Sequence, residues 1–364
     1  MGTKICELCL SPDLGGLELY MMRASHFLGD ECISVINEKG KLKSYYEDTP
    51  YRYMTLKRRN VFLSWLGARE LASIIDNEAI EVLHLHWTKD LPLAVMAKLI
   101  SKRKPRIVQS RHMRMTRFKD DFYHRFLYRN LNMILAVTQQ VKEQIEKFIP
   151  ESIRPKTEVL YIGAQQPTMI TEEEKQVHRD ELALSELFTV GIIGRIEPQK
   201  GQDIVLEAVK KLQGRGIDAK ALVIGAAMEE SYLQKLQNDY GDVGIFTGFT
   251  TQAQTMMQLC DVMVLATENE TFGLVLIEAM MCGVCVVASD SGGPLEIIDD
   301  GVNGLLFKMF ESDDLSNKLE LLQCDTALKE RYAIAGKKKA MDVFESERQF
   351  RELKILLENL CVSV

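Results

Sequence analysis

Several features that would place the chain in a familiar functional class are missing from its 364 residues. No stretch approaches the roughly 18 consecutive apolar residues of a membrane-spanning helix, and no signal peptide precedes the first expected strand, Ile5 to Leu10. The fingerprint G-x-G-x-x-G directly after a strand, typical of dinucleotide-dependent oxidoreductases, does not occur, and neither does the metal-chelating triplet D-x-D. We therefore expect a cytoplasmic protein that belongs to neither of these classes.

Cysteine is present, but its arrangement does not indicate a metal site. Eight cysteines include two C-x-x-C pairs, Cys6/Cys9 and Cys282/Cys285. Cys6 and Cys9 lie on an expected strand, where positions three apart point to opposite faces, and no nearby histidine completes a ligand set. We expect buried, reduced cysteines and no bound metal.

The length and composition indicate a globular protein of two domains with unevenly distributed charge. An apolar fraction of 46% and a charged fraction of 27% are ordinary for a soluble protein, and 364 residues are too many for one typical domain. Residues 1–165 hold 26 Lys/Arg against 19 Asp/Glu, whereas residues 166–364 hold 19 against 33. The basic excess has two interpretations: a solvated face, or a surface for anionic lipid headgroups or a phosphorylated acceptor.

Short apolar strands alternate with helix-length segments along nearly the whole chain, which predicts an α/β fold with parallel sheets. Strand candidates lie at residues 5–10, 32–36, 82–86, 107–110, 133–137 and 158–161, and then at 188–194, 219–224, 243–246, 262–266 and 284–288. Residues 168–186 are polar and are expected to connect the halves. We predict two doubly wound, Rossmann-like domains at residues 1–167 and 186–345, and a last helix at 346–364 that packs back on the first domain.

The most informative stretch contains Glu270 and Glu278, which stand eight positions apart between the apolar runs 261–266 and 284–288. Glu270 is expected outside the carboxyl end of a strand, where α/β sheets bind ligands. Eight helical positions make about two turns, so Glu278 is expected near the same face. The backbone N–H groups of residues 271–274, at the helix start, suit an anionic phosphate.

With these residues together, the chain resembles the retaining glycosyltransferases of family 4. That family has the GT-B fold, in which two Rossmann-like domains face each other across a cleft. The resemblance covers nearly the whole chain and is strongest over residues 194–307. Glu270 and Glu278 match the family's E-x7-E element. Further matches are Gly194-Arg195 with Gln199-Lys200-Gly201, residues 291–296 and 301–307, Gly15-Gly16, and His112.

The resemblance implies roles for these residues. Arg195 and Lys200 would neutralise the diphosphate that leaves a nucleotide sugar. Glu270 would hold the donor sugar without acting as a nucleophile, and Glu278 would bind the ribose. His112 would face the cleft opposite Glu270 and touch the donor sugar as a second catalytic residue. The remaining donor-side residues are Gly194, Gly15, Gly16, Thr271, Phe272, Gly273 and Leu274, with Phe249 in the pocket for the base.

A second group of candidates is assigned to the acceptor side: His86, Arg111 and Arg114. His84 and His86 alternate along one strand and therefore face the same side. His84 is expected in the core, and His86, near the strand end, is placed to help hold the acceptor. No third ligand is evident beside the two histidines, so they do not predict a metal site.

The sequence thus predicts a retaining, metal-independent hexosyltransferase that needs no cofactor besides its nucleotide-sugar co-substrate, with a UDP-sugar slightly favoured. The expected acceptor is a saccharide or a lipid-linked molecule of lipopolysaccharide, polysaccharide or glycoconjugate biosynthesis, and the expected place is the cytoplasm or the inner face of its membrane. The base stays open, because residues 225–228 depart from the family's usual Gly-x-Gly.

Three alternatives remain. The first is a nucleotide-sugar epimerase or a soluble sugar-phosphate synthase on the same fold. The second is a non-enzymatic nucleotide-sugar-binding subunit. The third is a transferase that modifies nucleic acid, which ranks last because no aromatic–basic stacking platform stands out in the sequence.

Overall fold

The computed structural model describes residues 2–47, 49–58 and 64–362, and the chain divides into two compact units. Residues 1–162 and 347–364 form the first unit, and residues 163–346 form the second. Each unit contains one parallel sheet, which confirms the predicted α/β class. Among the described residues, no helix combines the length and the hydropathy that a membrane span needs.

The division between the units lies before the predicted connection at 168–186. That segment contains helix α7 (Glu172–Glu181), which begins with a capping box formed by Thr171 and Glu174. The side-chain amide of Gln258 donates to the carbonyl of Thr168 at 3.0 Å and accepts from the N–H of Ile170 at the same distance. These bonds attach the polar segment to the second unit. Because α7 has no apolar stripe, its sequence did not predict a helix.

The first sheet has seven parallel strands in the order β3-β2-β1-β4-β5-β6-β7. They are β1 (Ile5–Cys9), β2 (Cys32–Asn37), β3 (Tyr53–Leu56), β4 (Val82–Leu85), β5 (Arg106–Arg111), β6 (Met133–Ala136) and β7 (Lys156–Val159). The strands predicted from the sequence do not include β3. It is a four-residue edge strand with the sequence YMTL, and only its last residue, Leu56, is buried. Cys6 and Cys9 pack into different apolar clusters, as their spacing on a strand predicts.

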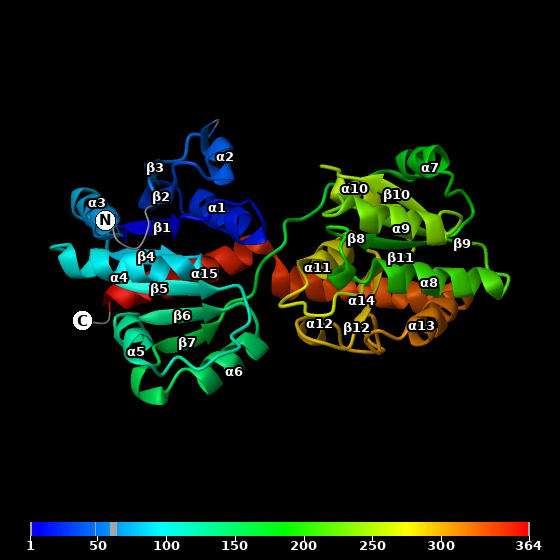
Figure 1. Ribbon diagram of the computed structural model, residues 1–364. Coiled ribbons are helices and arrows are strands. Elements are labelled where there is room, and N and C mark those ends of the chain that lie inside the picture. The colour runs from blue at the N-terminus through cyan, green and yellow to red at the C-terminus, as the bar shows by residue number, and fades with distance from the viewer. Residues whose placement is uncertain (1, 48, 59–63, 363–364) are drawn as a thin grey trace. The chain divides into compact units, whose positions relative to one another are not determined.

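Helices cover both faces of this sheet (Figure 1). They are α1 (Gly16–Leu28), α2 (Ser44–Glu47), α3 (Ser64–Asn77), α4 (Leu91–Ile100), α5 (Phe122–Arg129), α6 (Gln139–Phe148) and α15 (Ser346–Val362). Apolar residues of α3, α4, α5 and α6 fill one side of the core, and those of α1 and α15 fill the other. The last helix of the chain, red in Figure 1, is therefore part of the first hydrophobic core.

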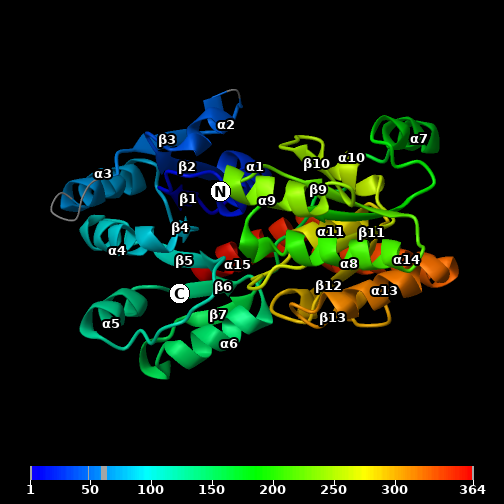
Figure 2. The ribbon, with the colours of Figure 1, turned by 45° about the vertical axis from the view of Figure 1, so that its right-hand side comes forward.

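The second sheet has six parallel strands in the order β10-β9-β8-β11-β12-β13. They are β8 (Phe188–Ile193), β9 (Ala219–Ile224), β10 (Gly244–Gly248), β11 (Val262–Leu265), β12 (Cys285–Ser289) and β13 (Leu305–Phe307). The helices are α7, α8 (Gln202–Gly214), α9 (Glu230–Tyr240), α10 (Ala253–Gln258), α11 (Leu274–Met281), α12 (Pro294–Ile297), α13 (Ser312–Cys324) and α14 (Thr326–Phe344). Helix α8 packs against β8 and β9, and α14 packs against β12; α8, β9, α14 and β12 are labelled in Figure 2.

A row of polar side chains crosses the face of the first sheet that α1 and α15 cover. Glu7 on β1 stands opposite His84 on β4, and both are fully buried. His84 Nδ1 lies 3.0 Å from Glu7 Oε1, and His86 Nε2 contacts Glu7 Oε2. The row extends from His84 Nε2 to Ser110 Oγ, at 2.8 Å, and from His86 Nδ1 to His112 Nε2, at 3.4 Å.

The expectation that no third ligand-type group accompanies His84 and His86 is therefore wrong. Glu7 supplies that group, and the three side chains offer ligand atoms within 4.8 Å of one another. Strand register, rather than proximity in the sequence, places the carboxylate there. Each of these atoms already has a hydrogen-bond partner inside the core, so the contacts are those of a satisfied polar network.

The network holds the carboxylate of Glu7 beside His86, a histidine whose pKa is lowered by burial. Burial opposes ionisation of Glu7, but the two imidazoles and their hydrogen bonds outweigh burial and lower its pKa to about 2. Burial lowers the pKa of His86 to about 4 and that of His112 well below its ordinary 6.5. At neutral pH Glu7 is ionised, whereas His86 and His112 are uncharged.

The last helix should contribute directly to the stability of the first unit. Leu353 is fully buried, whereas Ile355 on the same helix is 56% exposed. We expect Leu353→Ala to lower the free energy of unfolding by about 2–5 kcal/mol, and Ile355→Ala by less than about 0.5 kcal/mol. Both tryptophans, Trp65 and Trp87, lie in the first unit, so urea unfolding followed by tryptophan fluorescence measures this unit. Equal effects of the two variants would contradict this packing.

The neutral histidines should make the first unit acid-labile. Below pH 6.5 the unfolded chain binds protons at positions 86 and 112 that the folded chain does not bind until much lower pH, so stability falls as pH falls. Each histidine contributes a slope of up to about 1.4 kcal/mol per pH unit. We expect His86→Gln, whose amide can still donate to Glu7, to flatten the slope between pH 6.5 and pH 4.5, and His178→Gln on α7 to leave it unchanged. A wild-type slope near zero would refute the network's charge state.

Candidate functional site

The second sheet reverses its strand order between β8 and β11. The loops after these two strands run to opposite sides, and ligands of doubly wound folds bind in the crevice between such loops. The loop after β8 carries Gly194, Arg195 and Lys200, and the loop after β11 carries Glu270. Chain topology thus brings two separate predicted motifs to one edge of the sheet.

The two loops are in direct contact. Lys200 Nζ lies 3.5 Å from Glu270 Oε2, and both side chains are about one-quarter exposed. The N–H of Glu268 donates to the carbonyl of Gln199 at 3.1 Å. Arg195 is 62% exposed and pairs with Glu197 at 3.1 Å. In the site, Lys200 is therefore paired with the carboxylate of Glu270, and Arg195, on the same loop, is exposed to solvent.

Glycine permits this close approach at two positions. Gly201 has a φ of 72°, and a Cβ on it would lie 2.5 Å from the carbonyl oxygen of Ala266. Gly292, with the same φ, would place a Cβ 2.2 Å from the carbonyl oxygen of Glu270. Both residues belong to the segments that carry the family resemblance. Any larger residue would push apart the backbones that hold Lys200 and Glu270 together.

Glu270 accepts hydrogen bonds from two of the backbone N–H groups, within residues 271–274, that the sequence predicts to bind a phosphate. Its Oε1 accepts from the N–H of Thr271 at 3.1 Å and from that of Phe272 at 3.5 Å. These bonds fix the carboxylate at the carboxyl end of β11. Phe272 itself is buried and meets the ring of Phe344 edge-on, so its side chain is a core contact.

The helical spacing expected between Glu270 and Glu278 is wrong. Helix α11 begins only at Leu274, after Gly273 with a φ of 101°, so Glu270 precedes the helix and half of the interval is not helical. Glu278 lies in the second turn of α11 and is partly buried. The turn, rather than a two-turn helical repeat, decides where the second carboxylate lies relative to the first.

Two more predicted donor-side residues, Gly194 and Phe249, lie at the carboxyl ends of β8 and β10, which flank β9. Gly194 follows β8, and its N–H donates to the carbonyl of Ile224 at 2.9 Å. The N–H of Gly225 donates to Gly248 at 3.0 Å, which brings the end of β10 to the same edge. Phe249, directly after β10, is 78% exposed. An exposed aromatic ring at this edge is available to stack on a planar ligand.

In the first unit, His112 stands at the outer end of the polar row. It follows β5, its ring meets that of Tyr20 edge-on at 5.2 Å, and Tyr20 packs in turn on Phe350 of α15 at 5.5 Å. Its Nε2 faces His86, which is itself held by Glu7. Sequence reasoning missed Glu7 and Tyr20. Glu7 is an acid inside the apolar run 5–10, and this departure from the pattern is a signal that could have identified it.

Arg111, one of the three acceptor-side candidates, has a largely buried side chain. It is 8% exposed and donates to the carbonyls of Met113 at 3.0 Å and Arg114 at 3.2 Å. Its guanidinium thereby shapes the loop that follows His112, whereas the Arg114 side chain is exposed. Gly15 ends the loop after β1 and Gly16 begins α1, and a Cβ on Gly16 would meet nothing within 4 Å. Packing alone therefore does not require glycine at position 16.

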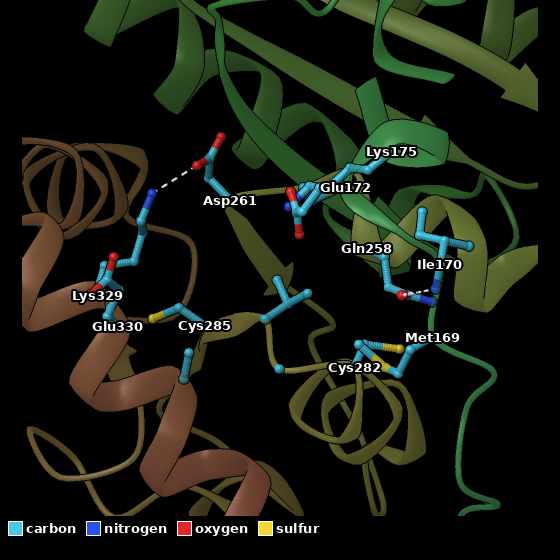
Figure 3. Close-up of a pocket in the computed structure, with 14 residues that line it drawn as sticks. Met169, Ile170, Glu172, Lys175, Gln258, Asp261, Cys282, Cys285, Lys329 and Glu330 are labelled. Atoms are coloured by element: carbon cyan, nitrogen blue, oxygen red, sulfur yellow. Dashed lines mark hydrogen bonds and ion pairs between the residues drawn. The ribbon is translucent and has the colours of Figure 1, made fainter. Parts of the chain in front are cut away.

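The cavity in Figure 3 lies at the other end of the second sheet. It has a volume of about 280 Å³ and is lined by Asp261, which precedes β11, and by Cys285, which opens β12. Asp261 pairs with Lys329 at 2.7 Å, as the dashed line shows. None of its described lining residues is a predicted site residue. The chemistry at the carboxyl edge, rather than this cavity, defines the candidate site.

Comparisons with known proteins cover both halves of the chain. The family described as Glycosyl transferase 4-like matches residues 7–140, and that described as Glycosyl transferases group 1 matches residues 173–339. An uncharacterized glycosyltransferase of Methanocaldococcus jannaschii is 23% identical over 329 residues, which are 85% of this chain and 86% of that protein. The capsular polysaccharide biosynthesis glycosyltransferase CapM of Staphylococcus aureus is 22% identical and covers 88% of each chain.

A solved structure gives the same picture of the fold. The crystal structure of Anabaena HepE in complex with UDP and glucose matches 98% of this chain and 99% of its own, with a TM-score of 0.84 and 23% identity. The two family matches fall on the two structural units, and the strand order of each unit is that of a doubly wound domain. The chain therefore belongs to the glycosyltransferases of family 4, with the two-domain GT-B fold.

Proposed function

We propose that the protein transfers a hexosyl group from a UDP-sugar to a saccharide or lipid-linked acceptor, with retention at the anomeric carbon and without a metal ion. The observation that carries this proposal is the contact of Lys200 with Glu270 at the reversal point of the second sheet, with Arg195 on the same loop. HepE, solved with UDP and glucose, supports the choice of donor, and CapM supports a product in polysaccharide biosynthesis.

The proposed roles follow from where charge develops. When the bond between the anomeric carbon and the diphosphate oxygen breaks, negative charge grows on the diphosphate. Arg195 and Lys200 are two cations on one loop and would neutralise that charge in place of a metal ion. Glu270, held by two backbone amides, would accept hydrogen bonds from the sugar hydroxyls, and Glu278 would accept them from the ribose.

Retention follows from a front-face path. The acceptor oxygen bonds to the anomeric carbon on the face from which the diphosphate departs, and the acceptor proton passes to a diphosphate oxygen. This path needs no covalent glycosyl–enzyme intermediate. A neutral His112 suits contact with the donor sugar, because it adds no positive charge beside the electron-poor anomeric carbon.

Measurements of donor binding and of sugar transfer should distinguish the proposed role of Arg195 from that of Glu270. We expect UDP to raise the thermal midpoint of the wild type equally with Mg²⁺ and with EDTA; at 100 times its dissociation constant it stabilises by about 2.7 kcal/mol. Arg195→Ala should lose most of that shift. Glu270→Gln should keep the shift and lose transfer of the sugar at least about 100-fold. Lys235→Ala, an exposed cation on α9, serves as the control. A shift that requires Mg²⁺ would refute the metal-independent mechanism, and full activity in Glu270→Gln would remove that residue's role.

The proposal also places the enzyme at the inner face of the cytoplasmic membrane, and one surface segment supports this. Residues 113–126, here named the 113–126 patch, expose five large apolar side chains: Met113 at 69%, Phe118 at 66%, Phe122 at 89%, Tyr123 at 52% and Phe126 at 42%. Arg114 and Arg117, both exposed, lie between them in the sequence. The basic residues of this segment already suggested a surface for anionic lipid headgroups, but the sequence does not reveal which of its apolar side chains point outward.

Exposed apolar rings near Arg114 and Arg117 match the interface of an anionic bilayer, where rings enter the headgroup region and cations meet phosphate. Burial of a phenylalanine contributes about 1.5–3 kcal/mol, which is enough for two exposed rings to govern a weak membrane affinity. The patch therefore gives the basic first half of the chain a defined point of attachment.

Flotation with vesicles tests this surface. We expect the wild type to float with vesicles of phosphatidylcholine and phosphatidylglycerol, and to float much less with phosphatidylcholine alone. Phe118→Ser combined with Phe122→Ser should reduce flotation at least about tenfold, since both rings leave the bilayer. Ile334→Ser on α14, which is 72% exposed in the second unit, should have no effect. Equal flotation of wild type with both vesicles would refute the membrane surface.

A further inference from the structure

A pocket lies at the point where the first sheet also reverses its strand order, between β1 and β4. It has a volume of about 240 Å³ and is lined by Leu10, directly after β1, and by Lys89 and Asp90, which follow β4. Lys57 and Arg58, after β3, complete the wall. This is the position in the first unit that corresponds to the proposed donor site in the second, and nothing in the proposed mechanism uses it.

Three cations line this pocket: Lys57, Arg58 and Lys89. Within the described residues, no carboxylate forms an ion pair with any of them. The guanidinium carbon of Arg58 lies 4.5 Å from the ring centroid of Trp87, and Lys89 Nζ lies 5.1 Å from the same centroid. Two cations of the pocket thus lie against one aromatic ring, and an anion bound in the pocket would be attracted by both.

The backbone adds to the positive potential. Ser64 is the first residue of α3, and Pro92 lies in the first turn of α4, so two helices of 14 and 10 residues begin at the pocket wall. Helix N-termini carry partial positive charge and favour phosphate. The side chain of Asp90 does not cap α4. Its Oδ2 accepts instead from the N–H of Leu10 at 2.8 Å and ties the two diverging loops together.

Asp90 is the one acid among the described residues that line the pocket, and its charge is reduced. Burial raises the pKa of its carboxyl to about 7, against the lowering effects of the Leu10 N–H and of Arg58. Near neutral pH a large fraction of this carboxyl is protonated. It then opposes a bound anion less than an ordinary aspartate, and its proton is available to a phosphate oxygen.

We propose that this pocket binds a phosphate group of the acceptor, with Lys57, Arg58 and Lys89 as its cations and Tyr123 beside them on α5. The inference rests on the proposed transferase function and narrows its acceptor to molecules that carry a phosphate monoester or diphosphate. That phosphate belongs either to a soluble sugar or polyol phosphate or to a lipid headgroup. Tyr123 also belongs to the 113–126 patch, so a phosphate in the membrane surface would lie next to the pocket.

Calorimetric titration of the full chain with glycerol 3-phosphate, and with glycerol at the same ionic strength, tests the proposal. Flotation with phosphatidic acid vesicles, scored as the excess over phosphatidylglycerol vesicles of matched surface charge so that the 113–126 patch does not contribute, forms a second arm. The test variant is Arg58→Gln combined with Lys89→Gln, and the control is Lys102→Gln, an exposed cation beyond the carboxyl end of α4. We expect phosphate binding to weaken at least about tenfold in the double variant and to stay unchanged in the control. Binding of glycerol 3-phosphate indicates a soluble acceptor, and binding of phosphatidic acid alone indicates a lipid.

Equal phosphate binding by wild type and double variant, or no phosphate binding in either arm, overturns the proposal. So does loss of phosphate binding in Arg195→Ala but not in the double variant, since the phosphate would then occupy the donor site. The UDP-induced thermal shift is measured in parallel on the same proteins. A normal shift in the double variant with no phosphate binding in the wild type rejects the pocket alone, whereas the absence of any nucleotide shift in the wild type rejects the transferase proposal.

Discussion

The reversal of strand order in each sheet is the constraint on which the rest of the structure depends. Parallel strands joined by crossover helices all end at one edge, and only where the winding changes direction do two neighbouring loops diverge. In the second unit this point brings Lys200 against Glu270, and in the first it brings Leu10 against Asp90. Both polar contacts join segments that are distant in sequence, and each lies where the sheet leaves room for a ligand.

Close backbone approach and buried charge both follow from this architecture. The loops of the second unit touch because Gly201 and Gly292 have no Cβ to separate them. In the first unit the core accepts a carboxylate, which is costly to bury unless hydrogen bonds satisfy it. Glu7 is satisfied by His84 and His86, and the same contacts orient His112 at the sheet edge. Stability of the core and geometry of the site therefore rest on one set of hydrogen bonds.

The two units differ in surface chemistry as they do in sequence charge. Part of the basic excess of the first 165 residues lies at the pocket between β1 and β4 and at the 113–126 patch. The aromatic side chains of Trp87 and Tyr123 lie near the cations of the pocket. In the second half, where acidic residues outnumber basic ones, the predicted site at the carboxyl edge of the sheet carries the cations Arg195 and Lys200. Both arrangements concentrate positive charge at a sheet edge, where phosphate groups bind most readily.

The sequence by itself determined the two α/β halves and the place of Arg195, Lys200 and Glu270 at strand ends, because apolar runs and the residues that follow them are local signals. It did not determine that Glu270 precedes its helix, since the turn depends on the backbone of Gly273. Only the tertiary structure decided which side chains meet. Glu7 contacts histidines 77 and 79 positions away, and those contacts exist because parallel register, which no local pattern encodes, aligns β1 with β4.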